Sequence, residues 1–61
     1  MSNAEKLNAY AAEVSKAEAE LRKSRPSMAD GIAIMKETGA RTISEAYHYA
    51  ARRIVNASAA G

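Results

Sequence analysis

Three helix-start signals constrain the fold of this 61-residue chain more than any other feature of its sequence. In each signal a Ser or Thr precedes an acidic residue by three positions, as in a capping box, where the two residues satisfy each other's backbone amides. The pairs are Ser2 with Glu5, Ser27 with Asp30, and Thr42 with Glu45. Apolar residues at helical spacing follow each pair. The sequence therefore predicts an all-α fold, a single small domain with helices over about residues 3–24, 28–38 and 43–57.

Proline and glycine mark where the first two helices end. Pro26 disfavours the helical conformation at Arg25 and should end the long first helix there. Gly39 is suited to the left-handed residue that follows a helix C-terminus. Gly31, inside the second helix, should permit a close approach of another backbone rather than act as a hinge. The tail that starts at Ser58 is expected to fray.

Apolar stripes predict which face of each helix is buried. In the first helix the stripe is Leu7, Tyr10, Val14, Ala17 and Leu21, which also fit the core positions of heptads. The second helix offers Met28, Ile32 and Met35, and the third offers Ile43, Ala46, Tyr47, Ala50 and Ile54. Ile34 and Val55 fall about 100° away from the centres of these stripes. We expect both residues to lie outside the core of a single chain and to mark a second buried surface.

The supply of large apolar side chains is small. Hydrophobic residues make up 48% of the chain, but 15 of these 29 residues are alanine. A domain of this size buries only about 60% of its unfolded surface, and the absence of cysteine excludes disulfides. We therefore expect a homodimer or higher oligomer. Its expected interface residues are Leu7, Tyr10, Val14, Ala17, Leu21, Ile34 and Val55.

Several functional classes find no support in the sequence. No apolar run approaches the roughly 18 residues of a membrane span, and no secretory signal is evident at the N-terminus, so a cytoplasmic protein is expected. His48 is the only histidine, and neither a cysteine nucleophile nor a glycine-rich phosphate loop is present. We predict a protein that is not an enzyme and has neither a cofactor nor a metal site.

Charge is unevenly distributed along the chain. The net charge is −2 over residues 1–20 and +4 over residues 21–61. A basic segment of this kind indicates either an anionic partner or a solvated surface. Glu18, an acid within the first apolar stripe, either pairs with Arg22 one turn on or fixes the register of a helix pairing.

The short connection over residues 39–42 has the layout of a helix-turn-helix. Beyond it, residue types that contact phosphates and base edges follow one side of the third helix. The candidate DNA-binding residues here are Arg41, Ser44, His48 and Arg52. One position departs from the usual spacing of a helix-turn-helix, because Glu45 stands where an apolar residue is expected.

Residues 36–47 (KETGARTISEAY) resemble the turn and second helix of Arc-type ribbon-helix-helix repressors, with Gly39 and the Ser44–Glu45 pair at the matching separation. Residues 22–26 (RKSRP) resemble the basic stretch that precedes the first helix of that family. The resemblance implies an intertwined dimer that binds DNA through a two-stranded ribbon, and it adds Arg22, Lys23 and Arg25 to the candidate DNA-binding residues. Neither alternating register before Pro26 is apolar, so the sequence leaves open whether residues 20–26 form a strand or continue the first helix.

Two functions are consistent with these features. The first is a small dimeric DNA-binding regulator of the phage or plasmid type. The alternative is a helical interaction module, an adaptor or inhibitor of a host protein that binds no nucleic acid. The charge distribution and the turn favour the first function, whereas the heptad stripe and the stray aliphatic residues favour the second.

Overall fold

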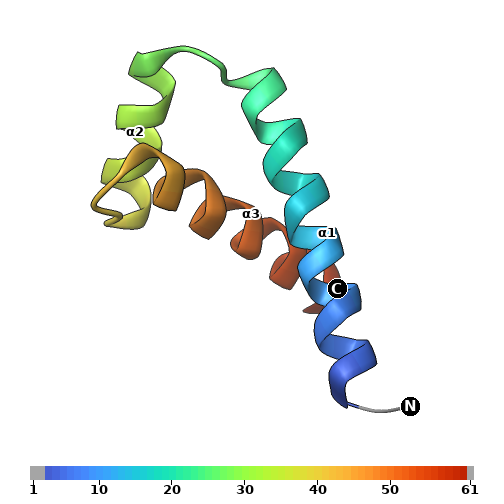
Figure 1. Ribbon diagram of the computed structural model, residues 1–61. Helices are drawn as coiled ribbons and strands as arrows, with labels where there is room; N and C mark the ends of the chain where they lie inside the picture. Colours follow the sequence, from blue (N-terminus) through green and yellow to red (C-terminus); the bar gives the residue numbers. More distant parts are fainter. Residues whose placement is uncertain (1–2, 61) are drawn as a thin grey trace.

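The computed structural model describes the backbone of residues 3–60 and the side chains of residues 3–58. It contains three helices, α1 (Asn3–Ser24), α2 (Met28–Thr38) and α3 (Ile43–Ala60), shown in Figure 1. The predicted all-α fold with a long first helix is confirmed. α3 continues three residues beyond its expected end. Of the tail that was expected to fray, Gly61 lies outside the described residues. None of the helices in this part of the chain is both long and apolar enough to cross a membrane.

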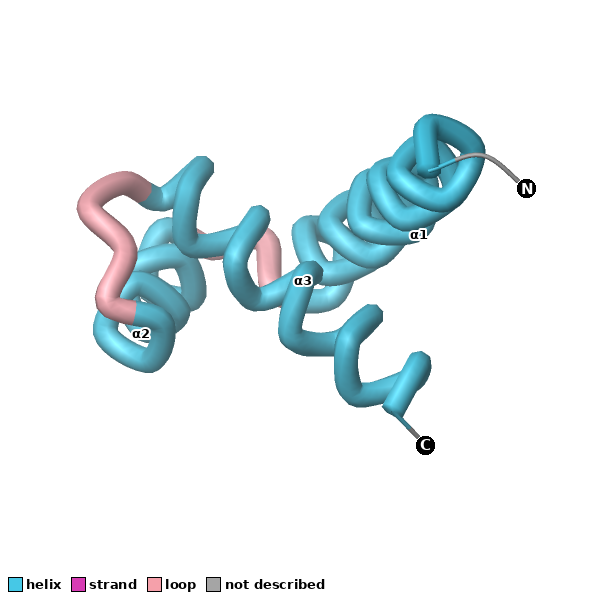
Figure 2. The backbone as a smooth tube through the Cα atoms, turned by 90° about the horizontal axis from the view of Figure 1, so that it is seen from below, coloured by secondary structure: helices cyan, strands magenta, loops and turns pink. Residues whose placement is uncertain are grey.

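α3 is the central element of the fold. It packs against both other helices, whereas α1 and α2 do not pack directly against each other within residues 3–60. The backbone view in Figure 2 shows α1 and α2 splayed apart on either side of α3. The molecule is elongated, with extents of 41 × 22 × 21 Å, and the N-terminal turns of α1 project past α3 (Figure 1).

The larger part of the core lies between α2 and the first half of α3. Ile34, at 1% exposure the most completely buried large side chain, packs there with Ala40, Ala46 and Tyr47. Leu21 of α1 and Met35 of α2 cover the edges of this cluster. The expectation that Ile34 lies outside the core is therefore wrong.

The orientation of α2 follows from its glycine rather than from its large side chains. A Cβ on Gly31 would lie 2.8 Å from Ile43 Cγ2, so only glycine lets α2 approach α3 this closely. That approach turns Gly31 and Ile34 inward. It leaves Met28 73% exposed and also exposes Ile32, although both were expected on the buried stripe.

A second, smaller core holds α1 against the C-terminal half of α3. Val14, Ala51 and Val55 are buried together, and Tyr10 and Ala17 pack against them. The expectation that Val55 lies outside the core is also wrong, since it is only 7% exposed. Because α3 has one helix on each flank, its buried arc is wider than a single stripe.

Most of the stripe predicted on α1 is thus used within one chain. Val14 is buried, and Tyr10, Ala17 and Leu21 pack against the two core clusters. Leu7 is exposed on the projecting turns of α1. Much of the burial of this stripe is therefore supplied by the rest of the same chain.

The caps explain why the helices begin and end where they do. The Ser27 hydroxyl accepts a hydrogen bond of 3.1 Å from the Asp30 amide, and the Asp30 carboxylate accepts one of 3.4 Å from the Ser27 amide. The predicted capping box of α2 is therefore confirmed. Thr42 Oγ1 accepts a 3.0 Å bond from the Glu45 amide at the start of α3. The pair of Ser2 with Glu5 lies partly outside the described residues.

Gly39 ends α2 in the left-handed conformation, with φ of 75°, and its amide donates a 2.8 Å bond to the Met35 carbonyl. We predict that Gly39→Ala lowers the free energy of unfolding by about 1 kcal/mol, because a Cβ disfavours this backbone conformation. No atom lies within 4 Å of the position of that Cβ, so the loss of stability would come from backbone strain and not from a steric clash. Urea denaturation measures it. Gly39→Asn should cost less, and equal stability of Gly39→Ala and the wild type would contradict the prediction.

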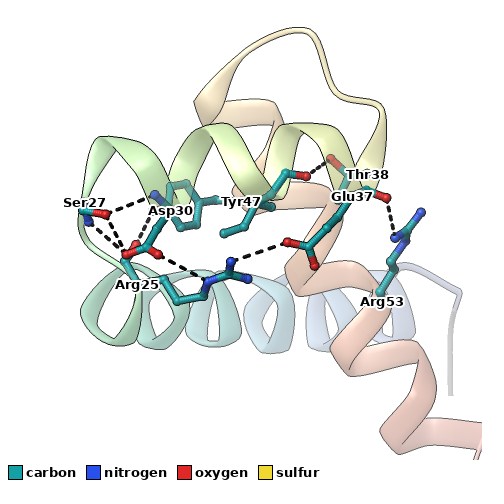
Figure 3. A network of polar contacts seen from close by, with 8 residues as sticks. Arg25, Ser27, Asp30, Glu37, Thr38, Tyr47 and Arg53 are labelled. Carbon is teal, nitrogen blue, oxygen red and sulfur yellow. Dashed lines mark hydrogen bonds and ion pairs between the residues drawn. The ribbon is translucent and has the colours of Figure 1, made fainter.

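A polar network joins the connection between α1 and α2 to the rest of the fold (Figure 3). The buried Tyr47 donates its hydroxyl hydrogen to the carbonyl oxygen of Arg25. The Arg25 guanidinium lies 3.9 Å from an Asp30 carboxylate oxygen and 3.4 Å from one of Glu37. Arg53 donates a 3.3 Å bond to the Glu37 carbonyl at the end of α2, where a cation is favoured by the helix dipole.

Candidate nucleic-acid interface

Four exposed candidate DNA-binding residues lie on α3 or directly before it and are here called the basic ridge: Arg41, Ser44, His48 and Arg52. The last three are spaced by four residues, so they share one side of the helix. Arg41 lies in the turn directly before α3. All four side chains are exposed. His48 and Arg52 also border a hollow between α1 and α3 that Tyr10 and Val14 line, so this end of the basic ridge lies beside α1.

The two arginines of the basic ridge are available to a partner. Within the described part of the chain, neither Arg41 nor Arg52 forms an ion pair or a hydrogen bond through its side chain. Glu45 raises the pKa of Tyr49, and both arginines lie close enough to Tyr49 for their charges to oppose that rise. Since neither charge is neutralised within the fold, both can contact an external anion.

Tyr49 and Glu45 form a pair beside the basic ridge. The Glu45 carboxylate accepts a hydrogen bond from the Tyr49 hydroxyl and repels the phenolate, so the pKa of Tyr49 is raised above its ordinary value of 10.0. The Glu45 carboxylate is thus engaged by a side chain of its own helix. Glu45 remains a negative charge near the start of α3, where the helix dipole favours it.

Glu18 connects the basic ridge to α1. One of its carboxylate oxygens lies 3.3 Å from an Arg22 nitrogen, and the other lies 3.5 Å from His48 Nδ1. The first of the two alternatives for Glu18, pairing with Arg22, is confirmed. The Arg22 guanidinium also lies over the Tyr47 ring, with 4.6 Å between its central carbon and the ring centroid. Arg22 thus lies near His48, although much of its charge is engaged within the fold.

The other basic residues near Pro26 do not join this surface. Arg25 is held by Asp30 and Glu37, and it serves the α1–α2 connection rather than a partner. Lys23 is exposed but lies about 100° around α1 from Arg22. Residues 20–24 are helical, so the strand alternative for this segment is wrong, and no strand occurs within residues 3–60.

Comparisons with protein-family models, with curated proteins and with solved structures found no match to this chain. Among the described residues, no cluster of three or more side chains could hold a metal ion.

Two side-chain contacts between α1 and α3 were not predicted from the sequence. The Tyr10 hydroxyl donates a 2.9 Å hydrogen bond to Asn56 Oδ1, which ties α1 to the C-terminal half of α3. The contact between His48 and Glu18 lies nearer the middle of α3. Each contact joins residues at least 30 positions apart, so no local pattern in the sequence could have revealed them.

Proposed function

We propose that this protein is a small, non-enzymatic DNA-binding regulator of the phage or plasmid type that acts in the cytoplasm through the basic ridge. The observation that carries the proposal is the pair of exposed arginines, Arg41 and Arg52, which no carboxylate within the described residues neutralises. Ser44 and His48 stand between them on the same side of α3. The arginines would bind phosphates, and the two shorter polar side chains would reach phosphates or base edges.

The geometry of α3 supports this assignment. From Ser44 to Arg52 the helix rises about 12 Å, and an α-helix fits into the DNA major groove. The tight turn at Gly39 leaves the N-terminal end of α3 open to solvent, with Arg41 beside it. Residues 21–61 carry a net charge of +4, which favours association with a polyanion.

Salt-titrated fluorescence anisotropy with a labelled duplex of mixed sequence tests the proposal. We predict that Arg41→Ala combined with Arg52→Ala weakens binding at least about tenfold and reduces the slope of log affinity against log salt by about 2 units, since two phosphate contacts are lost. Circular dichroism should show unchanged helicity, because both side chains are exposed.

A matched control separates the ridge from overall charge. Arg52→Ala and Lys6→Ala remove the same charge, but Lys6 lies on the projecting end of α1. Only the Arg52 variant should lower affinity by more than a few-fold. Wild-type affinity in the double variant, or the absence of any duplex binding at low salt, would overturn the proposal.

One observation favours the alternative, a helical module that binds a host protein. Met28 and Ile32 lie one turn apart on α2 and are both exposed. Met28 also borders a hollow lined by Pro26, Ile43 and Tyr47. Pull-down from a cell lysate with and without nuclease separates the functions. Capture of one host protein after nuclease treatment, without bound nucleic acid, would support this alternative.

A further inference from the structure

The molecule exposes more surface than a compact protein of its size. Its accessible surface is 4466 Å², whereas a compact monomer of 6.5 kDa exposes about 3,800 Å². Its radius of gyration is 12.4 Å, against about 10.5 Å for a globular chain of this length. The excess of roughly 600 Å² approaches the area of about 800 Å² that each partner buries in a standard protein interface.

The exposed Ile54 locates one surface that a partner could cover. It is 50% exposed although it lies in the middle of the buried arc of α3. Two adjoining hollows between α1 and α3 meet at Ala17, Glu20 and Ile54. One hollow extends along α1 to Glu13 and the other to Ser24. The uncovered apolar side chain therefore faces a shallow trough that follows α1.

Charges of alternating sign follow the same edge of α1: Glu13, Lys16, Glu20 and Lys23. At 100° per residue these four positions fall within about 80° of the helix circumference. A parallel, in-register copy of α1 would place like charges opposite each other. An antiparallel copy with its two-fold axis at the level of residue 18 instead places Lys16 opposite Glu20 and Glu13 opposite Lys23. Symmetry doubles both pairs.

We propose that the trough is the docking surface for a second copy of this chain, which pairs its α1 antiparallel to the first and covers Ile54 of both copies. Ala17 lets the two helices approach closely, and four ion pairs fix their register. Ile54 lies close to the two-fold axis, because the two hollows meet at Ala17 and Glu20. This pairing does not depend on the proposed binding of DNA.

The pairing leaves the basic ridge free. Arg52 and Ile54 are two residues apart on α3 and therefore lie about 200° apart around the helix. Covering Ile54 does not cover Arg52. The dimer would present two basic ridges on surfaces that face away from the contact between the copies.

A charge-exchange experiment tests the register. Sedimentation equilibrium should show that Lys16→Glu and Glu20→Lys each weaken self-association about tenfold or more, equivalent to about 1.4 kcal/mol, because each variant opposes like charges twice. An equimolar mixture of the two variants should associate at least as well as the wild type, since all opposed charges are then complementary. If a substitution acted only by changing charge interactions within its own α1, that effect would remain in the mixture, and association would not recover. A wild-type chain that stays monomeric at hundreds of micromolar, or a mixture that does not recover, would overturn the proposal.

A second pair of variants tests the apolar contact. Ile54→Arg should abolish the dimer at tens of micromolar while circular dichroism shows an unchanged fold, because half of this side chain is already exposed. Met28→Arg introduces the same charge at an exposed site on α2 and should leave the dimer intact. A dimer that survives Ile54→Arg, or one lost equally in both variants, would contradict the assignment to this trough.

Discussion

Replacing Val14 with Asp should unfold the protein, even as a single chain. Val14 is buried against Ala51 and Val55, in the small cluster that holds α1 to α3. An unpaired carboxylate at such a site costs several kcal/mol, and a core of this size rarely supplies more than about 3–5 kcal/mol of stability. The variant should therefore lose most of its helical circular dichroism at pH 7 and 25 °C.

The pH dependence of this variant gives a further check. Burial raises the pKa of a carboxyl group above the ordinary Asp value of about 3.9. The folded state of Val14→Asp therefore binds a proton more tightly than its unfolded state does, so its stability should fall as the pH rises through the range above 4. The variant should therefore lose less free energy of unfolding, relative to the wild type at the same pH, at pH 3 than at pH 7.

Leu7→Asp is the matched control, since it replaces another aliphatic residue of the same stripe, on the exposed turns of α1. It should change stability by no more than about 0.5 kcal/mol, as surface substitutions do. Equal stability of the two variants would show that α1 is not held to α3 by this cluster.

The helix boundaries could be predicted because their causes are local. The capping box of Ser27 with Asp30 and the left-handed Gly39 each act within a few residues, and both are present as expected. The end of α1 at Ser24, two residues before Pro26, has the same local origin. Only the C-terminal end of α3 was misplaced, where the sequence offers no proline and no glycine before Gly61.

The buried faces were harder to predict, because they depend on which neighbour each helix meets. The large side chains of α2 favoured Met28 and Ile32 as its inward face, yet the fit of Gly31 against Ile43 decides the orientation. On α3, the helix on each flank widened the buried arc to include Val55. Such effects follow from tertiary packing and leave no periodic signal in a single helix.

In the candidate site, too, local features were predicted and contacts between distant residues were not. The exposure of Ser44, His48 and Arg52 was predicted from their spacing on α3, and that of Arg41 from its place in the turn before this helix. The engagement of Arg25 by Glu37 was not predicted, because it joins residues 12 positions apart across the α1–α2 connection. Composition identifies basic residues, but only the fold separates those that bind acids of the same chain from those left for a partner.

Replacing Ile34 with Ala should destabilise the protein by about 2–5 kcal/mol, the usual cost of truncating a fully buried aliphatic side chain to Ala. Ile34 is the largest fully buried side chain among the described residues, and it packs against Tyr47 and two alanines, whose methyl groups have no rotamers that could fill the space left behind. Against the small total stability of such a domain, this loss should leave a substantial unfolded fraction at 25 °C. Thermal and urea denaturation followed by circular dichroism measure it.

Ile32→Ala provides the comparison that decides which face of α2 is buried. The two variants lose the same atoms from the same helix, two positions apart, and gain the same helix propensity. Because Ile32 is exposed, its truncation should cost less than about 1 kcal/mol. The apolar stripe in the sequence predicts the reverse order, with Ile32 the costly position. A larger loss for Ile32→Ala than for Ile34→Ala would therefore mean that α2 packs with its stripe inward, and that Gly31 does not set its orientation.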